Sequence, residues 1–280
     1  MSQGQGTGTD PELPTDLSSD INTNVAHSAR VYDYWLGGKD NFPADRELAE
    51  LMIQAIPDMR AMAAANRAFL SRAVRYLVGE AGVRQFLDLG TGIPTSPNVH
   101  EIAQAAAPDT RVVYVDNDPI VLAHARALLT SQDAGETAFI MADLRQPGSI
   151  LDHPTLTAPL DLGQPVAVLA VGVLMYFRDS DSPNPFEMVA TMLAPMPSGS
   201  YLALTTPTPD FSPEETAKAV AAAEAAGITL VPRSKAEVER FFTGLELVDP
   251  GVAPMLAWRP DEPPADPESA YYWAGVARKP

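Results

Sequence analysis

From residue 84 onward, short β-rich runs alternate with helical runs, and this alternation constrains the fold more than any other feature of the chain. Seven runs have strand character: 84–89, 111–116, 137–143, 165–172, 200–206, 245–250 and 271–279. Helical patterns lie between them, at about 97–106, 119–130, 185–194, 213–226 and 234–242. Because strands joined by helices usually pair in parallel, the alternation predicts an α/β protein with a doubly wound parallel sheet. A proline-rich stretch joins the last two strands, so we expect the final strand to run antiparallel.

The first 80 residues do not show this alternation. Residues 1–20 are rich in Gly, Ser, Thr, Asp and Pro, and we expect a disordered tail there. Residues 21–80 look helical, and the run 61–78 has apolar residues at 62, 65, 69, 70, 73, 74 and 77, which is the spacing of one helix face. This segment is short for a core of its own, so we expect an N-terminal helical lid on a main domain at 81–280.

Composition limits the classes of partner. The formal net charge is −17, and a strongly acidic protein repels phosphate backbones, so nucleic acid is not an expected partner. The chain has no cysteine, which excludes disulfides and thiolate catalysis. Its four histidines lack metal-ligand spacing, so no metal site is expected. The N-terminus lacks a signal-peptide pattern and no apolar stretch reaches about 18 residues, so we expect a soluble, cytoplasmic protein with no membrane partner.

The first predicted strand runs into a glycine turn, Asp88-Leu-Gly90-Thr91-Gly92. Glycine allows a turn with positive φ and lets backbone N–H groups approach a ligand closely. In an open parallel sheet, ligands bind beyond the carboxyl ends of the strands. The motif therefore predicts a nucleotide-like ligand at this turn.

The surrounding residues distinguish between two such ligands. Dinucleotide folds use Gly-x-Gly-x-x-Gly, but here Thr95 replaces the third glycine, and Pro94 and Pro97 remove two N–H donors. Asp88 stands two residues before the first glycine, where its carboxylate would repel a pyrophosphate and attract an ammonium group. The combination points away from NAD and towards S-adenosylmethionine, which carries adenosine and an α-amino acid but no phosphate.

Acidic residues also follow the second and third predicted strands. Asp116 is positioned to accept hydrogen bonds from both ribose hydroxyls, and Asn117 and Asp118 behind it suit the cap of the next helix. After the third strand, Asp143 is expected to accept from the adenine amino group, while the Leu144 N–H faces a ring nitrogen. Because the carboxyl ends of parallel strands lie along one edge, this series predicts a single adenosyl pocket.

Several longer strings give the chain a family resemblance. They are ARVYDYWLGGKDNFPAD (29–45), NRAFLSRAVRYL (66–77), QFLDLGTGIPT (85–95), VVYVDNDPIVLAHARALL (112–129), ADLRQP (142–147), WRPD (258–261) and YWAGVARK (272–279). With them the chain resembles the class I S-adenosylmethionine-dependent methyltransferases. More closely, it resembles the bacterial S-adenosyl methyltransferase family once catalogued only as a domain of unknown function.

This resemblance implies a Rossmann-like, seven-stranded sheet with one antiparallel strand, and N-terminal helices that close over the cofactor, S-adenosyl-L-methionine. It implies a cofactor pocket made by Asp88, Gly90, Gly92, Asp116, Asn117, Asp143 and Leu144. Where the family leads us to expect Leu-His-Phe after the fourth strand, this chain has Leu174-Met175-Tyr176-Phe177. The resemblance does not extend to a methyl acceptor.

The acceptor side offers fewer signals. Methyl transfer from a sulfonium is an in-line displacement that needs the acceptor close to the methyl carbon and water excluded. Tyr32 and Tyr176 offer aromatic faces to the sulfonium, and His27, Tyr32 and Tyr176 are the candidate catalytic residues. Asn-Pro-Pro-Tyr directly after the fourth strand, which is typical of amide and base N-methyltransferases, is absent, and this argues against DNA-base methylation.

Lys39 is the candidate partner of the cofactor carboxylate, with Asn66 and Arg67 as alternatives. The leading hypothesis for the whole chain is a methyltransferase that acts on an unidentified small-molecule acceptor. The alternative is a catalytically silent protein that senses S-adenosylmethionine. A third hypothesis, an NAD(P)-dependent oxidoreductase, is disfavoured by Thr95 and by the prolines of the turn.

Overall fold

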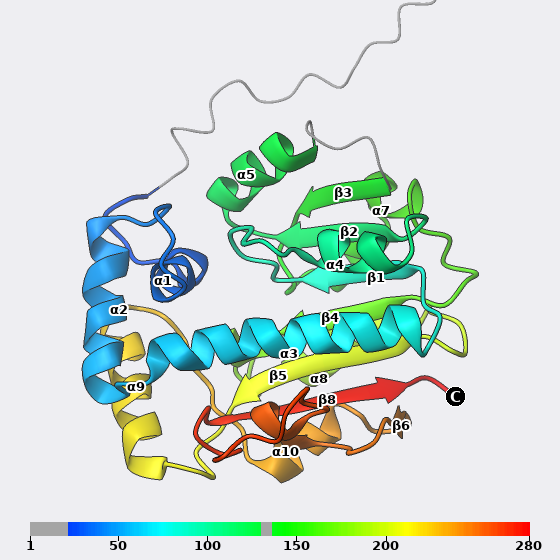
Figure 1. Cartoon of the computed structure of the whole chain (residues 1–280). Coiled ribbons are helices and arrows are strands. Elements are labelled where there is room, and N and C mark those ends of the chain that lie inside the picture. Colours follow the sequence, from blue (N-terminus) through cyan, green and yellow to red (C-terminus); the bar gives the residue numbers. More distant parts are fainter. Residues whose placement is uncertain (1–21, 130–135) are drawn as a thin grey trace, which may run out of the picture.

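A computed structural model describes residues 22–129 and 136–280 of the chain. The disordered tail expected at 1–20 lies outside the described residues. Figure 1 shows a central twisted sheet with helices packed along it. The strands are β1 (Gln85–Leu89), β2 (Arg111–Asp116), β3 (Glu136–Met141), β4 (Ala167–Val171), β5 (Tyr201–Pro207), β6 (Glu246–Leu247), β7 (Ala253–Pro254) and β8 (Tyr272–Arg278).

Ten α-helices lie within the described residues. They are α1 (Ser28–Trp35), α2 (Pro43–Ala55), α3 (Met59–Gly79), α4 (Val99–Ala106), α5 (Pro119–Leu129), α6 (Pro147–Leu151), α7 (Pro154–Thr157), α8 (Pro185–Leu193), α9 (Pro213–Ala225) and α10 (Lys235–Arg240). Two 3-10 turns, η2 (Leu174–Tyr176) and η3 (Met255–Ala257), follow β4 and β7. None of these helices is long and apolar enough to cross a membrane.

The strand order along the sheet is β3-β2-β1-β4-β5-β8-β6, with β7 attached to β8. Strands β1 to β5 pair in parallel, whereas β8 runs antiparallel to both β5 and β6. The predicted doubly wound α/β sheet with an antiparallel final strand is therefore confirmed. All seven predicted strands form, and β7 adds a two-residue strand that no local pattern announced. The strand predicted at 245–250 is shorter than expected, because Pro250 has no N–H to pair and Gly251 turns the chain with φ +80°.

The sheet is covered on both faces. Every residue of β1 and of β5 is buried, as expected for strands between two helical layers. Alternate residues of one strand enter different cores: Phe86 packs with the N-terminal helices and α4, while its neighbour Leu87 packs with α8 on the opposite face. This two-sided burial explains why these strands read as continuous apolar runs instead of alternating ones.

The N-terminal helical segment divides into two parts. Helix α3 lies along β4 and buries the predicted stripe, with Phe69, Ala73, Val74 and Leu77 fully enclosed (Figure 1). It is thus one layer of the sheet's core. Helices α1 and α2 stand instead beyond the carboxyl ends of the parallel strands, where α2 also packs on α9. Of the three N-terminal helices, only α1 and α2 lie where a helical lid is expected.

Candidate functional site

A cavity of about 330 Å³ opens beyond the carboxyl ends of β1, β2, β3 and β4, beneath the start of α1. It brings together nearly all of the residues singled out in the sequence: His27, Tyr32, Asp88, Gly90, Thr91, Gly92, Asp116, Asn117, Asp143, Leu144 and Tyr176. Asn66 and Arg67 also line it, from α3. We call it the polar cavity. Residues from four strand ends and two helices therefore converge on one space.

The glycine turn has the geometry that its sequence predicts. Gly90 and Gly92 both adopt φ +66°, a conformation that other residues rarely take. A Cβ on Gly90 would lie 2.2 Å from Cγ2 of Val173, so the turn also needs glycine to pack against the end of β4. A Cβ on Gly92 would meet nothing within 4 Å. The backbone at Gly92 thus borders open space, where a ligand can approach it closely.

Asp116 ties this turn to β2. One carboxylate oxygen accepts the Gly92 N–H at 2.8 Å and the other accepts the Asp118 N–H at 3.0 Å. The side chain is largely buried, and burial raises its pKa although these two hydrogen bonds and His27 oppose the shift. Each oxygen keeps a lone pair for a further donor. The carboxylate can therefore hold the turn and accept ligand hydroxyls at once.

Asp88 lies deeper, at the end of β1. Burial raises the pKa of its carboxyl to about 7, against the opposing influence of Arg67 and of a hydrogen bond with Thr91. A nearby positive charge favours the ionised form of a carboxyl group. A buried aspartate with this pKa is therefore suited to a ligand that brings a cation of its own.

Arg67 supplies the positive charge on the α3 wall of the polar cavity. Its Nη2 donates to the carbonyl oxygens of Thr95 at 2.5 Å and Pro97 at 2.7 Å, which fixes the guanidinium beside the glycine turn. Lys39, the first candidate for a cofactor carboxylate, does not line the cavity and is exposed. Arg67, named in the sequence only as an alternative, lines the cavity.

The position of Lys39 has a local cause in the loop between α1 and α2. The buried carboxylate of Asp33 accepts the Asp40 N–H at 3.0 Å and the Asn41 side-chain amide at 2.8 Å. A Cβ on Gly38 would collide with the same carboxylate at 1.9 Å. The loop is therefore drawn onto Asp33, and Lys39 is left facing solvent.

Tyr32 belongs to a buried hydrogen-bond chain. Its hydroxyl donates to the Ala63 carbonyl at 3.0 Å and accepts from Asn66 Nδ2 at 3.1 Å, while Asn66 Oδ1 accepts from the Thr205 hydroxyl at 2.7 Å. Burial raises the pKa of Tyr32 to about 12, so the phenol stays protonated at neutral pH. Its role as a general base is therefore disfavoured, and it links α1 to α3 and β5.

The other two catalytic candidates differ from each other. His27 places Nδ1 2.9 Å from Oδ2 of Asp118, and its backbone N–H donates to Asp45 at 2.8 Å, so it joins α1 to α2 and α5. Burial raises the pKa of Asp118, but hydrogen bonding and charge from His27 outweigh it and the net shift is downward. Burial raises the pKa of Tyr176 well above that of a free phenol. Tyr176 is therefore a neutral hydroxyl at the cavity wall.

The end of the cavity at β3 carries hydrogen bonds within the protein itself. Asp143 accepts the Arg145 backbone N–H at 2.9 Å and its guanidinium at 3.0 Å, and Leu144 is buried beside it. Arg145 also lines the polar cavity, which the sequence did not suggest. Like Asp116, Asp143 thus keeps a lone pair on each carboxylate oxygen for a further donor.

Other lining residues were also missed, and two groups of them come from loops. Gly172 and Val173 follow β4 at the same edge as the acids, and their position at the end of the predicted run 165–172 was a usable signal. Ile228 and Thr229 come from the loop after α9. Nothing local marks that loop, because contacts between distant segments place it: α9 packs on α2, and the Val231 N–H donates to the Met175 carbonyl at 2.8 Å.

The polar groups of the cavity suit a cofactor that carries no phosphate. The site offers buried carboxylates at the tips of β1 and β2, an anchored guanidinium and an open glycine backbone. Such a donor set suits a molecule with hydroxyls, an ammonium group and a carboxylate. Within the described residues, no cluster of His, Asp or Glu could hold a metal ion.

Comparison with solved structures shows which proteins share this fold. A magnesium protoporphyrin IX methyltransferase from Synechocystis PCC 6803, solved with bound SAH, has a TM-score of 0.51 and 12% identity over 89% of this chain and 93% of its own. That likeness concerns the fold alone. The fold is therefore that of the class I S-adenosylmethionine-dependent methyltransferases.

The family is more specific than the class. The family described as S-adenosyl methyltransferase matches residues 14–280, so the chain belongs to it, and S-adenosylmethionine is its cofactor. A DUF574 family protein from Streptomyces avermitilis MA-4680 is 46% identical, covering 92% of this chain and 99% of its own, with a TM-score of 0.88. A protein from Thermobifida fusca YX is 41% identical, covering 95% and 98%, with a TM-score of 0.85. A comparison with curated proteins gave no match.

Proposed function

We propose that this chain transfers the methyl group of S-adenosylmethionine to a small-molecule acceptor. The convergence of Asp88, Asp116 and Arg67 on the polar cavity carries the proposal. These groups match a ligand with an ammonium group, a ribose and a carboxylate. Membership of a methyltransferase family supports transfer over binding alone.

The residues of the polar cavity divide between the two ends of the cofactor. Asp88 receives the ammonium group and Arg67 the carboxylate, because the two side chains lie near each other beside the glycine turn. Asp116 and Asn117 receive the ribose hydroxyls. Gly90, Thr91 and Gly92 form the backbone wall between these ends, and Asp143 and Leu144 border the adenine.

The cofactor supplies the methyl group as an electrophile: the acceptor's lone pair forms the new bond to carbon, the carbon–sulfur bond breaks with its electron pair left on sulfur, and the acceptor's proton passes to solvent. The protein contributes position and shelter from water. Helix α1 covers the cavity and is held there by the His27–Asp118 contact and the Tyr32–Asn66 bond. Tyr176, as a neutral phenol, offers a hydrogen bond without taking a proton.

Calorimetric titration with S-adenosylmethionine, S-adenosylhomocysteine and NAD tests the cofactor assignment. The first two should bind and NAD should not, because the turn lacks the third glycine and carries Asp88. Tight binding of NAD alone would remove the proposal. A silent sensor would bind the cofactor yet form no S-adenosylhomocysteine with any member of a broad acceptor panel.

The expected partners and location stay predictions from composition. The net charge of −17 disfavours binding to nucleic acid, and a filter-binding assay with single- and double-stranded DNA at low salt would reveal any such affinity. Fractionation of cells that produce the tagged chain tests the cytoplasmic location.

A further inference from the structure

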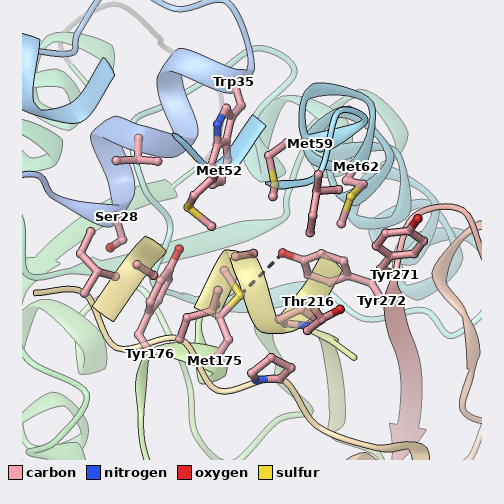
Figure 2. Close-up of a pocket in the computed structure, with 18 of the residues that line it drawn as sticks. Ser28, Trp35, Met52, Met59, Met62, Met175, Tyr176, Thr216, Tyr271 and Tyr272 are labelled. Carbon is pink, nitrogen blue, oxygen red and sulfur yellow. Dashed lines mark hydrogen bonds between the residues drawn. The ribbon is translucent and has the colours of Figure 1, made fainter. Parts of the chain in front are cut away.

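A second cavity lies beside the polar one, between α1, α2, α3 and α9 (Figure 2). We call it the apolar cavity. Its walls include four methionines, Met52, Met59, Met62 and Met175, that come from three different parts of the chain. The open space is about 40 Å³, enough for a few water molecules. Among the described residues that line it, no side chain carries a charge.

Most polar atoms in this lining already have partners. The Trp35 indole donates to the Ala49 carbonyl at 3.3 Å, and Thr216 donates to a carbonyl oxygen at 3.2 Å. The Tyr271 hydroxyl donates to Glu215 at 2.6 Å, and the Tyr272 hydroxyl contacts the Met175 sulfur at 3.6 Å, the dashed line in Figure 2. These groups are directed to the protein, so the space between them is apolar in character.

The two cavities share a wall. Ser28, Tyr176 and Ile228 line both of them. Figure 2 shows the hydroxyls of Ser28 and Tyr176 on one side of the apolar cavity, across from Tyr271. The polar groups of the shared wall therefore lie where the apolar cavity meets the cofactor site.

We propose that the apolar cavity holds the methyl acceptor, an uncharged apolar molecule with one aromatic ring or a short alkyl chain, whose hydroxyl, amine or thiol points to Ser28 and Tyr176. This inference rests on the proposed function, because the shared wall then separates the acceptor from the cofactor. A charged acceptor is disfavoured, because burying an unpaired charge among apolar side chains is strongly unfavourable unless the group changes its protonation state.

The methionine walls explain how a space this small accepts a ring. Methionine side chains are unbranched and rotate about three bonds, so they can repack around a ligand at low cost. Met52 comes from α2, Met59 and Met62 from α3 and Met175 from η2, so side chains on several sides of the cavity can repack while the sheet stays in place. A single ring is within reach of such repacking, whereas a fused polycyclic body would need the helices themselves to part.

Calorimetry on the full chain saturated with S-adenosylhomocysteine tests the acceptor class. The probes are p-toluidine and 4-aminobenzoate, which share a ring and a neutral amine but differ in a methyl group against a carboxylate. We expect p-toluidine to bind at least about tenfold more tightly, because the carboxylate finds no partner in the apolar cavity. A crystal soaked with p-toluidine should show its amine beside Tyr176.

Two α9 variants locate the probe. Ala219→Leu fills the apolar cavity and should weaken p-toluidine at least about tenfold while S-adenosylhomocysteine affinity stays within about twofold. Ala221→Leu, on the exposed face of the same helix, should change neither affinity. If Ala219→Leu fails to fold, Met52→Ala serves instead: its larger cavity should favour 4-butylaniline over p-toluidine.

The outcomes separate the two proposals. If S-adenosylhomocysteine does not bind, the proposed function fails and the acceptor assignment falls with it. If S-adenosylhomocysteine binds but both probes have equal affinity, the acceptor assignment is overturned and the proposed function stands. The same conclusion follows if Ala219→Leu leaves the affinity for p-toluidine unchanged.

Discussion

The polar cavity and the apolar cavity differ in what builds them. The polar cavity is made largely by turns at the tips of β1, β2, β3 and β4, where backbone N–H groups and short acidic side chains end up exposed to one space. The apolar cavity is made by the buried faces of helices, which contribute long apolar side chains. One fold thus offers a charged environment and an apolar environment in two adjacent cavities that share a wall.

The largest expected effect is a loss of stability from a substitution in the glycine turn of the polar cavity. Gly90→Ala forces a Cβ into Val173 and a side chain into the left-handed region, and should cost about 2–5 kcal/mol of stability. Denaturant unfolding measures it. Gly92→Ala is the matched control, because it has the same φ but open space, and should cost only about 1–2 kcal/mol. Equal losses in the two variants would contradict the role of the Val173 contact.

A pH experiment examines the buried carboxyl of the polar cavity. The pKa of Asp88 is about 7 in the folded protein and 3.8 in the unfolded chain. As the pH rises, the unfolded chain therefore loses this proton first. The free energy of unfolding then falls as the pH rises from 3.8 to about 7. Asp88→Asn should therefore be more stable than the parent by about 2–4 kcal/mol at about pH 8, and nearly equal below about pH 4.

The same variant links stability to binding. Asp88→Asn should bind S-adenosylhomocysteine more weakly, because the neutral amide cannot pair with its ammonium group. In the parent protein, affinity should rise as the pH passes about 7, since only the ionised carboxyl pairs with that cation. Asp152→Asn, at an exposed site, should show neither effect. A variant with unchanged affinity would remove Asp88 from the cofactor site.

Asp116→Ala tests the ribose end of the polar cavity. We expect S-adenosylhomocysteine affinity to fall by about 1.5–3 kcal/mol, the usual range for hydrogen bonds to a charged group. Because Asp116 also accepts the N–H groups of Gly92 and Asp118, a loss of stability should accompany it. Calorimetry and thermal melting separate the two effects, with Asp152→Ala as the control. Unchanged affinity would count heavily against the site.

The smallest expected effect lies on the shared wall. Tyr176→Phe removes one hydroxyl and keeps the ring, so p-toluidine should bind about fivefold more weakly, the value of one neutral hydrogen bond. S-adenosylhomocysteine affinity should stay within about twofold, because the proposed site gives its principal contacts to Asp88, Asp116 and Arg67. A larger loss for the cofactor product than for the probe would mean that the Tyr176 hydroxyl serves the cofactor and not the acceptor.

Local patterns predicted the parts of the site that depend on strand ends. Asp88, Gly90 and Asp116 each follow or end a run of buried β-forming residues, so their position could be deduced from sheet topology. Lys39 faces solvent and does not line the polar cavity, because its loop packs onto the buried carboxylate of Asp33, a contact that no local pattern announced. The guanidinium of Arg67 is positioned by hydrogen bonds to two backbone carbonyls some thirty residues away in the chain, which no local pattern predicts.

The sequence by itself determined the doubly wound sheet, the glycine turn and the acids along one edge, because period, turn chemistry and strand ends are properties of neighbouring residues. Only the tertiary structure decided that α3 lies against the sheet while α1 and α2 cover its edge, and that four methionines meet Tyr176 around a second cavity. Those placements depend on how distant helices pack, which no short stretch of sequence encodes.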